Sequence, residues 1–320
     1  MWATMSIRGR ERELLNMKLK LIAVNLVLCS LTVLWAEAFE INGAECGSTS
    51  TPTPVISDRA ADRGEFPWTV YLTIFSTGNA RYGCGGSIIT RKHVLTSAQC
   101  LIPGERIAKI EVNYGSCDLN LTEKVEVEAV LVRTAFHSVR DIGIAVLLVK
   151  APFQYTPDVK PICLPRRSYV VHDVQFAAPR WAINVPGRPG GIYLEAFFFT
   201  LQRNEVCRKV FGADFRMDTM YCGKDIRIKY GRGYFGGPRA IQSTDGRYVQ
   251  IGIAANLGTS CRIGNVITRI DVFMPWIEKM IGVRSAYQNL PSYAPLVTGV
   301  ARLSPFMFTP DLPGLEPWYF

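Results

Sequence analysis

Histidine is scarce in this chain. Only three His occur among 320 residues, and none of them stands in a cluster with Cys, which argues against a zinc site. We also find no nucleic-acid-binding motif and no evident internal repeat. The sequence therefore predicts a protein without metal, cofactor or nucleic-acid partner.

A second long hydrophobic run is missing as well. A bilayer span needs about 20 apolar residues, and no run after residue 38 reaches that length. The run Leu21 to Trp35 follows two lysines and precedes Ala36-Glu37-Ala38, a small-x-small pattern typical of signal cleavage. We predict a signal peptide over residues 1–38, with Met17 as an alternative start of translation. Once this peptide is removed, we expect a secreted, extracellular protein that is not bound to a membrane. A retained signal anchor is the alternative.

Acidic residues are outnumbered. The chain has 36 Lys and Arg against 27 Asp and Glu, a net charge of +9. Residues 1–38 hold five basic and three acidic residues, so the remainder has 31 against 24 and keeps a charge of +7. Such an excess favours an anionic partner such as a sulfated glycan, but the basic residues are dispersed, which also fits a plain role in solubility.

Cysteine, by contrast, is well represented. Nine Cys are present, and Cys29 lies in the predicted signal. The other eight belong to a chain directed to export, so they indicate disulfide bonds rather than metal ligands.

The remaining chain divides by composition. Residues 39–54 form a lead-in with Cys46 and a Ser-, Thr- and Pro-rich stretch, which is typical of an exposed irregular segment. From residue 55 to about 285, short runs rich in Val, Ile, Tyr and Phe alternate with turn residues, which predicts an all-β barrel or sandwich. Strands are expected over Trp68–Ile74, Ile107–Val112 and Tyr248–Ile253.

Helix and tail are predicted near the end. Pro275–Ile281 is the one segment that indicates a helix, with Pro in its first turn. Residues 286–320 contain six Pro and scattered aromatics without periodicity, so we expect an unstructured tail.

Several motifs inside residues 55–285 occur in a fixed order. They are Gly64–Trp68, Cys84–Ile89 with Val94–Cys100, Asp141–Leu147 with Lys160–Pro165, and Gly233–Pro238. In order and spacing the chain resembles the trypsin-like (chymotrypsin-fold) serine proteases. The resemblance implies two six-stranded antiparallel β-barrels, a cleft between them that holds the active site, and a C-terminal helix.

The catalytic triad is incomplete under this resemblance. The family needs a Ser deprotonated by a His that an Asp orients. Here Gln99 stands before Cys100 where the His belongs, and Phe235 stands where the Ser belongs. An amide takes no proton at neutral pH and a phenyl ring has no nucleophile, so Asp141 alone matches its position.

Other catalytic features depart from the family pattern too. Pro54 stands where zymogens have the basic residue of the cleavage site, and Tyr234 replaces the Asp that binds the freed amino terminus. Lys229 occupies the position where trypsin-like members carry an acid that binds basic side chains. His93 and His137 are expected outside the cleft. The resemblance thus implies that activation, recognition and catalysis have all been lost.

The resemblance also implies disulfides. The pairs are Cys84–Cys100, Cys207–Cys222, and Cys46 with Cys163. Cys261 has lost its usual partner, and its state and that of Cys117 stay open between a bond to another chain, idle thiols and an unexpected pair. A sequon, Asn120-Leu121-Thr122, predicts N-glycosylation on a polar loop.

The predicted function is regulatory. The resemblance points to a non-catalytic serine protease homologue of the arthropod type, which binds an extracellular protease, zymogen or inhibitor in an immune or developmental cascade. Two alternatives stay open. One is a residual serine-type endopeptidase, for which the sequence offers no nucleophile, and the other is an adhesion protein that binds glycans.

Overall fold

The structure is a computed structural model of the chain. It describes residues 15–29, 40–51, 59–101, 106–133, 143–169, 174–185, 188–223, 235–255, 266–282 and 299–302. Two compact units cover Met1–Glu40 and Ile41–Phe320. The first unit contains a helix over residues 15–29. Among the described helices none combines the length and apolar character required to cross a membrane.

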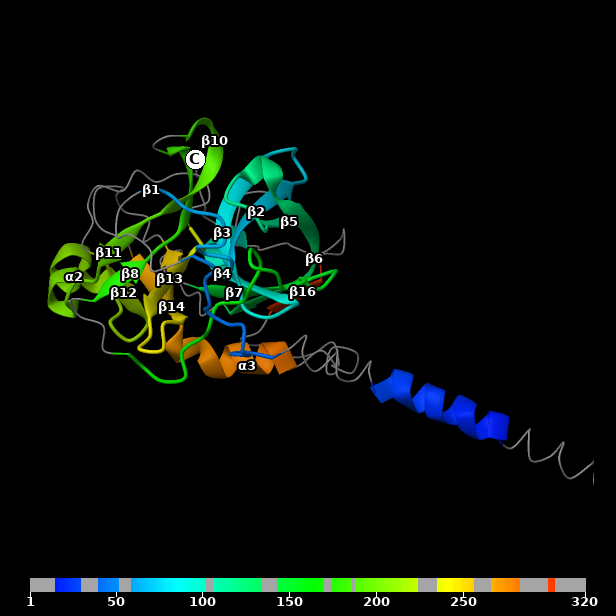
Figure 1. The fold of residues 1–320 in the computed structure, drawn as a ribbon. Coiled ribbons are helices and arrows are strands. Elements are labelled where there is room, and N and C mark those ends of the chain that lie inside the picture. Colours follow the sequence, from blue (N-terminus) through cyan, green and yellow to red (C-terminus); the bar gives the residue numbers. More distant parts are fainter. Residues whose placement is uncertain are drawn as a thin grey trace, which may run out of the picture. The chain divides into compact units, whose positions relative to one another are not determined.

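The first sheet of the second unit is a barrel (Figure 1). Its strands are β2 (Thr69–Ser76), β3 (Arg81–Ile88), β4 (His93–Ser97), β5 (Ile107–Tyr114), β6 (Glu123–Arg133) and β7 (Ile144–Val149). They pair in the order β6-β5-β2-β3-β4-β7, and β6 also pairs with β7, which closes the ring. In β2, Val70, Leu72 and Ile74 alternate along the strand and are fully buried in one core cluster.

The second sheet has six strands. They are β8 (Gln175–Ala177), β11 (Phe198–Thr200), β12 (Met220–Cys222), β13 (Pro238–Gln242), β14 (Tyr248–Ala255) and β15 (Val266–Arg269). Their order is β11-β8-β13-β14-β15-β12, and a bridge between Leu201 and Gly223 joins the ends of the two outer strands. The core of this sheet includes Phe176, Ile251 and Ile267.

A smaller sheet joins distant parts of the sequence. Its order is β1-β10-β9, from β1 (Arg59–Ala60), β10 (Arg188–Ala196) and β9 (Arg180–Val185). The guanidinium of Arg59 donates hydrogen bonds to both carboxylate oxygens of Glu65, at 3.0 and 2.8 Å, and Glu65 is 1% exposed. This buried pair fixes the segment that follows residue 58.

Helices are few. Short 3-10 helices are η1 (Ala98–Leu101), η2 (Leu119–Leu121), η3 (Gly212–Asp214) and η4 (Asp271–Phe273), and α-helices are α2 (Asn204–Phe211) and α3 (Met274–Gly282). Helix α3 confirms the expected C-terminal helix. Sequence analysis missed α2, although Val206, Cys207, Val210 and Phe211 stand at helical spacing along it; of these, only Cys207 is fully buried.

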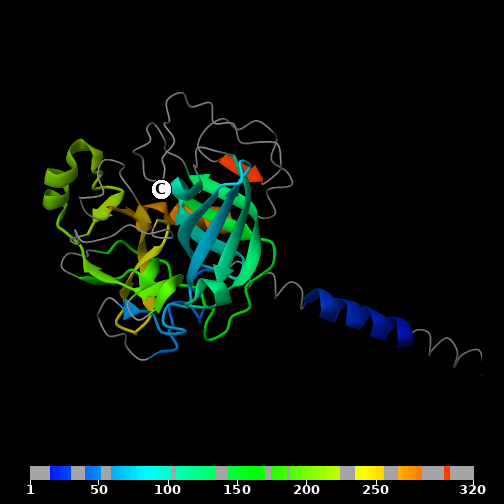
Figure 2. The same ribbon diagram turned by 90° about the horizontal axis from the view of Figure 1, so that it is seen from above.

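The tail differs from its prediction. Within residues 286–320 the structure describes 299–302, and these form strand β16 (Gly299–Arg302). It pairs antiparallel with Ala129–Val132 of β6, at the edge of the first barrel (Figure 2). The expectation of an unstructured tail is wrong for these four residues. Pairing of β6 with β5 ends at Glu126, so the residues of β6 that follow have backbone groups on that edge that β5 leaves unpaired. A strand can pair with these groups through its own backbone, whatever its side chains are.

The predicted fold class is otherwise confirmed. The described chain is mostly antiparallel β-structure, with a closed six-stranded barrel, a second six-stranded sheet and a C-terminal helix. The three expected strands correspond to β2, β5 and β14.

Candidate functional site

The turn at Phe235 and Gly236 is held against the first barrel by its backbone. The amide of Gly85 donates to the carbonyl of Phe235 at 2.6 Å, and the amide of Gly236 donates to the carbonyl of Ala254 at 2.9 Å. One contact comes from β3 and the other from β14. The turn therefore lies where the two large sheets meet.

The backbone conformation and close neighbours of residue 236 explain why a glycine is needed there. Its φ is +82°, a left-handed conformation that L side chains rarely adopt. A Cβ atom built here would lie 2.3 Å from Thr96 Oγ1 and 2.4 Å from the carbonyl oxygen of Gly85. The close approach of three backbone segments thus accounts for this glycine without any catalytic role.

The Phe235 side chain belongs to both cores. Its ring is partly buried and packs against the hydrophobic cluster of the first barrel and also against that of the second sheet. The position that the resemblance assigns to a nucleophile therefore holds an apolar contact between the two sheets.

Gln99 lies close to the same point. It belongs to η1 between Ala98 and Cys100, and it is only partly exposed. The Sγ atom of Cys100 lies 3.6 Å from the carbonyl oxygen of Phe235. The fold thus brings the Gln99 and Phe235 segments together at one disulfide.

Asp141, the third triad position, lies outside the described residues. The chain returns to the described part at Gly143, whose carbonyl accepts a hydrogen bond from Ala98 at 3.1 Å. Other positions that sequence analysis singled out also fall outside it, namely Pro54, His137, Lys229, Tyr234 and Cys261.

His93 has a structural environment. It opens β4 and is 2% exposed, and its Nδ1 lies 2.8 Å from Thr90 Oγ1. His93 is thus a buried residue of the first barrel.

Thr96 is a residue of this region that sequence analysis overlooked. Its hydroxyl donates to the carbonyl of Gly85 at 2.8 Å, and it is fully buried beside Gly236. Thr96 stands three residues before Gln99, within the motif that ends at Cys100. This position in the sequence was the signal that could have identified it as part of this region.

A buried hydrogen bond crosses between the two large sheets. Ser87 of β3 donates to Gln250 Oε1 of β14 at 2.7 Å, and both side chains are fully buried. A buried polar side chain is stable only if its hydrogen-bond partner is correctly placed. The bond therefore helps to fix the position of the two sheets relative to each other.

Three disulfides hold the fold. They are Cys46–Cys163, Cys84–Cys100 and Cys207–Cys222, the pairs that the resemblance implies. The first connects the lead-in to the strand-rich domain. The second contacts the backbone carbonyl of Phe235 through Cys100.

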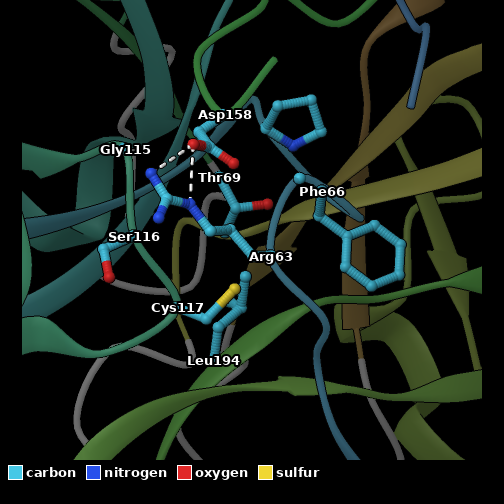
Figure 3. Close-up of a pocket in the computed structure, with 10 residues that line it drawn as sticks. Arg63, Phe66, Thr69, Gly115, Ser116, Cys117, Asp158 and Leu194 are labelled. Carbon is cyan, nitrogen blue, oxygen red and sulfur yellow. Dashed lines mark hydrogen bonds and ion pairs between the residues drawn. The ribbon is translucent and has the colours of Figure 1, made fainter. Parts of the chain in front are cut away.

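A separate pocket surrounds Cys117 (Figure 3). Cys117 has a free thiol, which donates to the carbonyl of Asp62 at 3.2 Å. Burial raises the pKa of this thiol to about 12. The nearby Arg63 guanidinium is held by Asp158 at 2.7–2.8 Å. A protonated thiol beside a neutralised ion pair is poorly suited to nucleophilic chemistry.

The Asn120 sequon lies on a surface turn. Asn120 is exposed in the middle of η2, and its backbone amide donates to Asp118 Oδ1 at 2.9 Å. This places the predicted acceptor on the loop between β5 and β6.

Comparison with known proteins identifies the family. The sequence model of the trypsin family matches residues 55–277. Chymotrypsin-2 of Vespa crabro is 29% identical over 234 residues, covering 70% of this chain and 99% of its own. Proclotting enzyme of Tachypleus tridentatus is 26% identical and covers 73% and 68%, and the clotting factor G beta subunit of that species is 25% identical and covers 80% and 89%.

Solved structures support the same fold. The structure described as GrC has a TM-score of 0.61 at 22% identity, over 71% of this chain and all of its own. The structure described as HL collagenase has a TM-score of 0.59 at 22% identity, over 72% of this chain and all of its own. With the family model matching more than half of its length, this chain belongs to the trypsin family.

Proposed function

We propose that this chain is a secreted, non-catalytic member of the trypsin family that regulates an extracellular proteolytic cascade by binding. The packing of Phe235 carries the proposal. A phenyl ring that contacts two hydrophobic clusters has replaced any nucleophile at the turn, and the turn's backbone bonds leave it little freedom to bring another residue there.

Gln99 supports the same conclusion, because the triad also needs a general base. Gln99 lies at the disulfide next to Phe235, and the sequence resemblance assigns it the place of the family's His. A carboxamide is neutral at pH 7 and cannot act as a general base. Loss of either the Ser or the His from such a triad costs on the order of 10⁶ in turnover, and losing both adds little.

The relatives suggest the kind of partner. Two of them are named for clotting, and this chain shares their fold family. We infer that the partner is a protease, its zymogen or an inhibitor. A basic charge makes an anionic glycan the other candidate.

Inactivity is tested directly. Purified protein lacking residues 1–38 is incubated with a fluorophosphonate probe and a broad peptide library, beside an active trypsin-family protease as control. We expect neither labelling nor turnover, because Phe235 has no hydroxyl and Gln99 cannot act as a general base. Labelling of any residue, or turnover above background, would contradict the non-catalytic part of the proposal.

Binding needs a separate test. The immobilised protein is exposed to extracellular fluid of the source organism, and each captured protease, zymogen or inhibitor is then purified and assayed alone. We expect the protein to change the activation rate of such a partner, while a reduced and alkylated sample does not. Capture of no such partner, or unchanged activation rates, would oppose the regulatory part.

A further inference from the structure

The turn that carries Asn120 presents an acceptor amide to solvent. Asn120 is exposed, and within the described residues its side-chain amide makes no hydrogen bond. The turn itself is well fixed, since Asp118 Oδ1 accepts from the Asn120 amide and the Thr122 hydroxyl donates to the carbonyl of Leu119 at 2.8 Å. The backbone of the sequon is thus ordered, and the nitrogen that would be modified is free.

Next to the acceptor stands an unusually exposed apolar side chain. Leu121 is 74% exposed, and no other large hydrophobic side chain in the described part of the chain is as exposed. A single exposed Leu is ordinary on a protein surface. Leu121 follows Asn120 directly in the sequence, so a glycan on Asn120 would be attached one residue away from this exposed side chain.

We propose that Asn120 carries an N-linked glycan and that the first sugars of this glycan cover Leu121. The modification forms a bond from Asn120 Nδ2 to the anomeric carbon of a lipid-linked oligosaccharide. The bond from that carbon to the lipid pyrophosphate breaks, and Nδ2 loses a proton. The proposal rests on the extracellular route of the proposed function, because this transfer occurs in the secretory pathway.

The sequence makes the test unambiguous. Asn120-Leu121-Thr122 is the only Asn-X-Ser/Thr triplet in the chain, so any N-linked glycan reports this residue alone. The full chain is expressed in eukaryotic cells, and both medium and cells are analysed with and without peptide-N-glycosidase. We expect a mass shift on enzyme treatment, with Asn120 converted to Asp.

Two variants separate glycosylation from other changes. Thr122→Ala removes the hydroxyl that the transferase requires, so the mass shift should vanish, whereas Thr122→Ser keeps the hydroxyl and should keep the shift. Absence of a glycan from the protein in both medium and cells overturns the proposal. A glycosylated protein that stays in the cells upholds it and counts instead against extracellular function.

Covering of Leu121 is tested by a double-mutant cycle. Asn120→Gln should increase self-association at high concentration, measured by light scattering, because Leu121 loses its cover. Leu121→Ser should reverse this increase in the Asn120→Gln background and change little in the glycosylated protein. Equal effects of Leu121→Ser in both backgrounds would show that the glycan does not cover this side chain.

Discussion

The ring of Phe235 contacts hydrophobic clusters of both large sheets, so its loss should weaken the connection between them. We expect Phe235→Ser to lower the free energy of unfolding by about 2 kcal/mol, measured by urea denaturation, because it removes a partly buried aromatic side chain. The same variant should hydrolyse no peptide, since Gln99 still offers no base.

Phe235→Leu is the matched control for stability. It keeps most of the apolar contact, so its unfolding free energy should fall by less than half as much. Measured hydrolysis by Phe235→Ser would contradict the expectation that Gln99 also prevents catalysis.

Gly236 allows backbone strain and crowding to be separated. Gly236 and Gly246 share a φ of +82°, but a Cβ on Gly246 meets nothing within 4 Å, whereas on Gly236 it meets Thr96 and Gly85. We expect Gly246→Ala to cost about 1 kcal/mol of stability and Gly236→Ala about 3 kcal/mol or more. Equal shifts in the urea midpoint would mean that the turn relaxes and that the fit at Gly236 is loose.

At the scale of elements, the lead-in is held by a disulfide that closes a long loop. Cys46–Cys163 spans 117 residues, Cys207–Cys222 spans 15, and all four cysteines are buried. In the chain-entropy view, the longer loop stabilises by about 5 kcal/mol and the shorter by about 3 kcal/mol.

Paired substitution to Ala tests this difference. We expect the Cys46→Ala, Cys163→Ala double variant to unfold at lower urea than the Cys207→Ala, Cys222→Ala variant. The second pair serves as the burial-matched control. The reverse order would indicate that the lead-in contributes little to the domain and that the Cys207 loop contributes through packing.

Helices and strands differ in how well their own residues predict them. Strand β2 follows from alternating residues such as Val70, Leu72 and Ile74, because one face of the strand lies against a core. Helix α2 is anchored by the Cys207 disulfide, and β16 by backbone bonds to β6. Strand β16 has four residues, too few to show a period, so periodicity could not predict it. Helix α2 does have apolar residues at helical spacing, Val206, Cys207, Val210 and Phe211, and sequence analysis did not use that signal.

For the whole molecule, alkaline pH should be destabilising. Burial raises the pKa of Cys117 from 9.0 to about 12, and it is also the main cause that raises the pKa values of Tyr114, Tyr221 and Tyr248 from 10.0 to about 12. Between pH 9 and 12 the folded state therefore binds more protons than the unfolded state. The stabilisation that these four groups contribute in their protonated form is fully present below pH 9 and is lost as pH rises toward 12.

The measurement is a series of urea midpoints. We expect the midpoint to be constant from pH 7 to pH 8.5 and to fall steadily from about pH 9 upward. A midpoint that stays constant up to pH 12 would contradict the burial of these four side chains.

The sequence by itself determined the β-rich architecture and the absence of a nucleophile at residue 235, because composition and residue identity are displayed directly by a single chain. Its resemblance to the trypsin-like serine proteases implied the family and the disulfide pairs. Only the tertiary structure decided that Phe235 packs against two cores, that Gly236 is required by Thr96 and Gly85, and that Leu121 stands exposed beside Asn120. Each of these depends on which distant segments meet, and such contacts arise from the packing of the whole chain rather than from any local pattern.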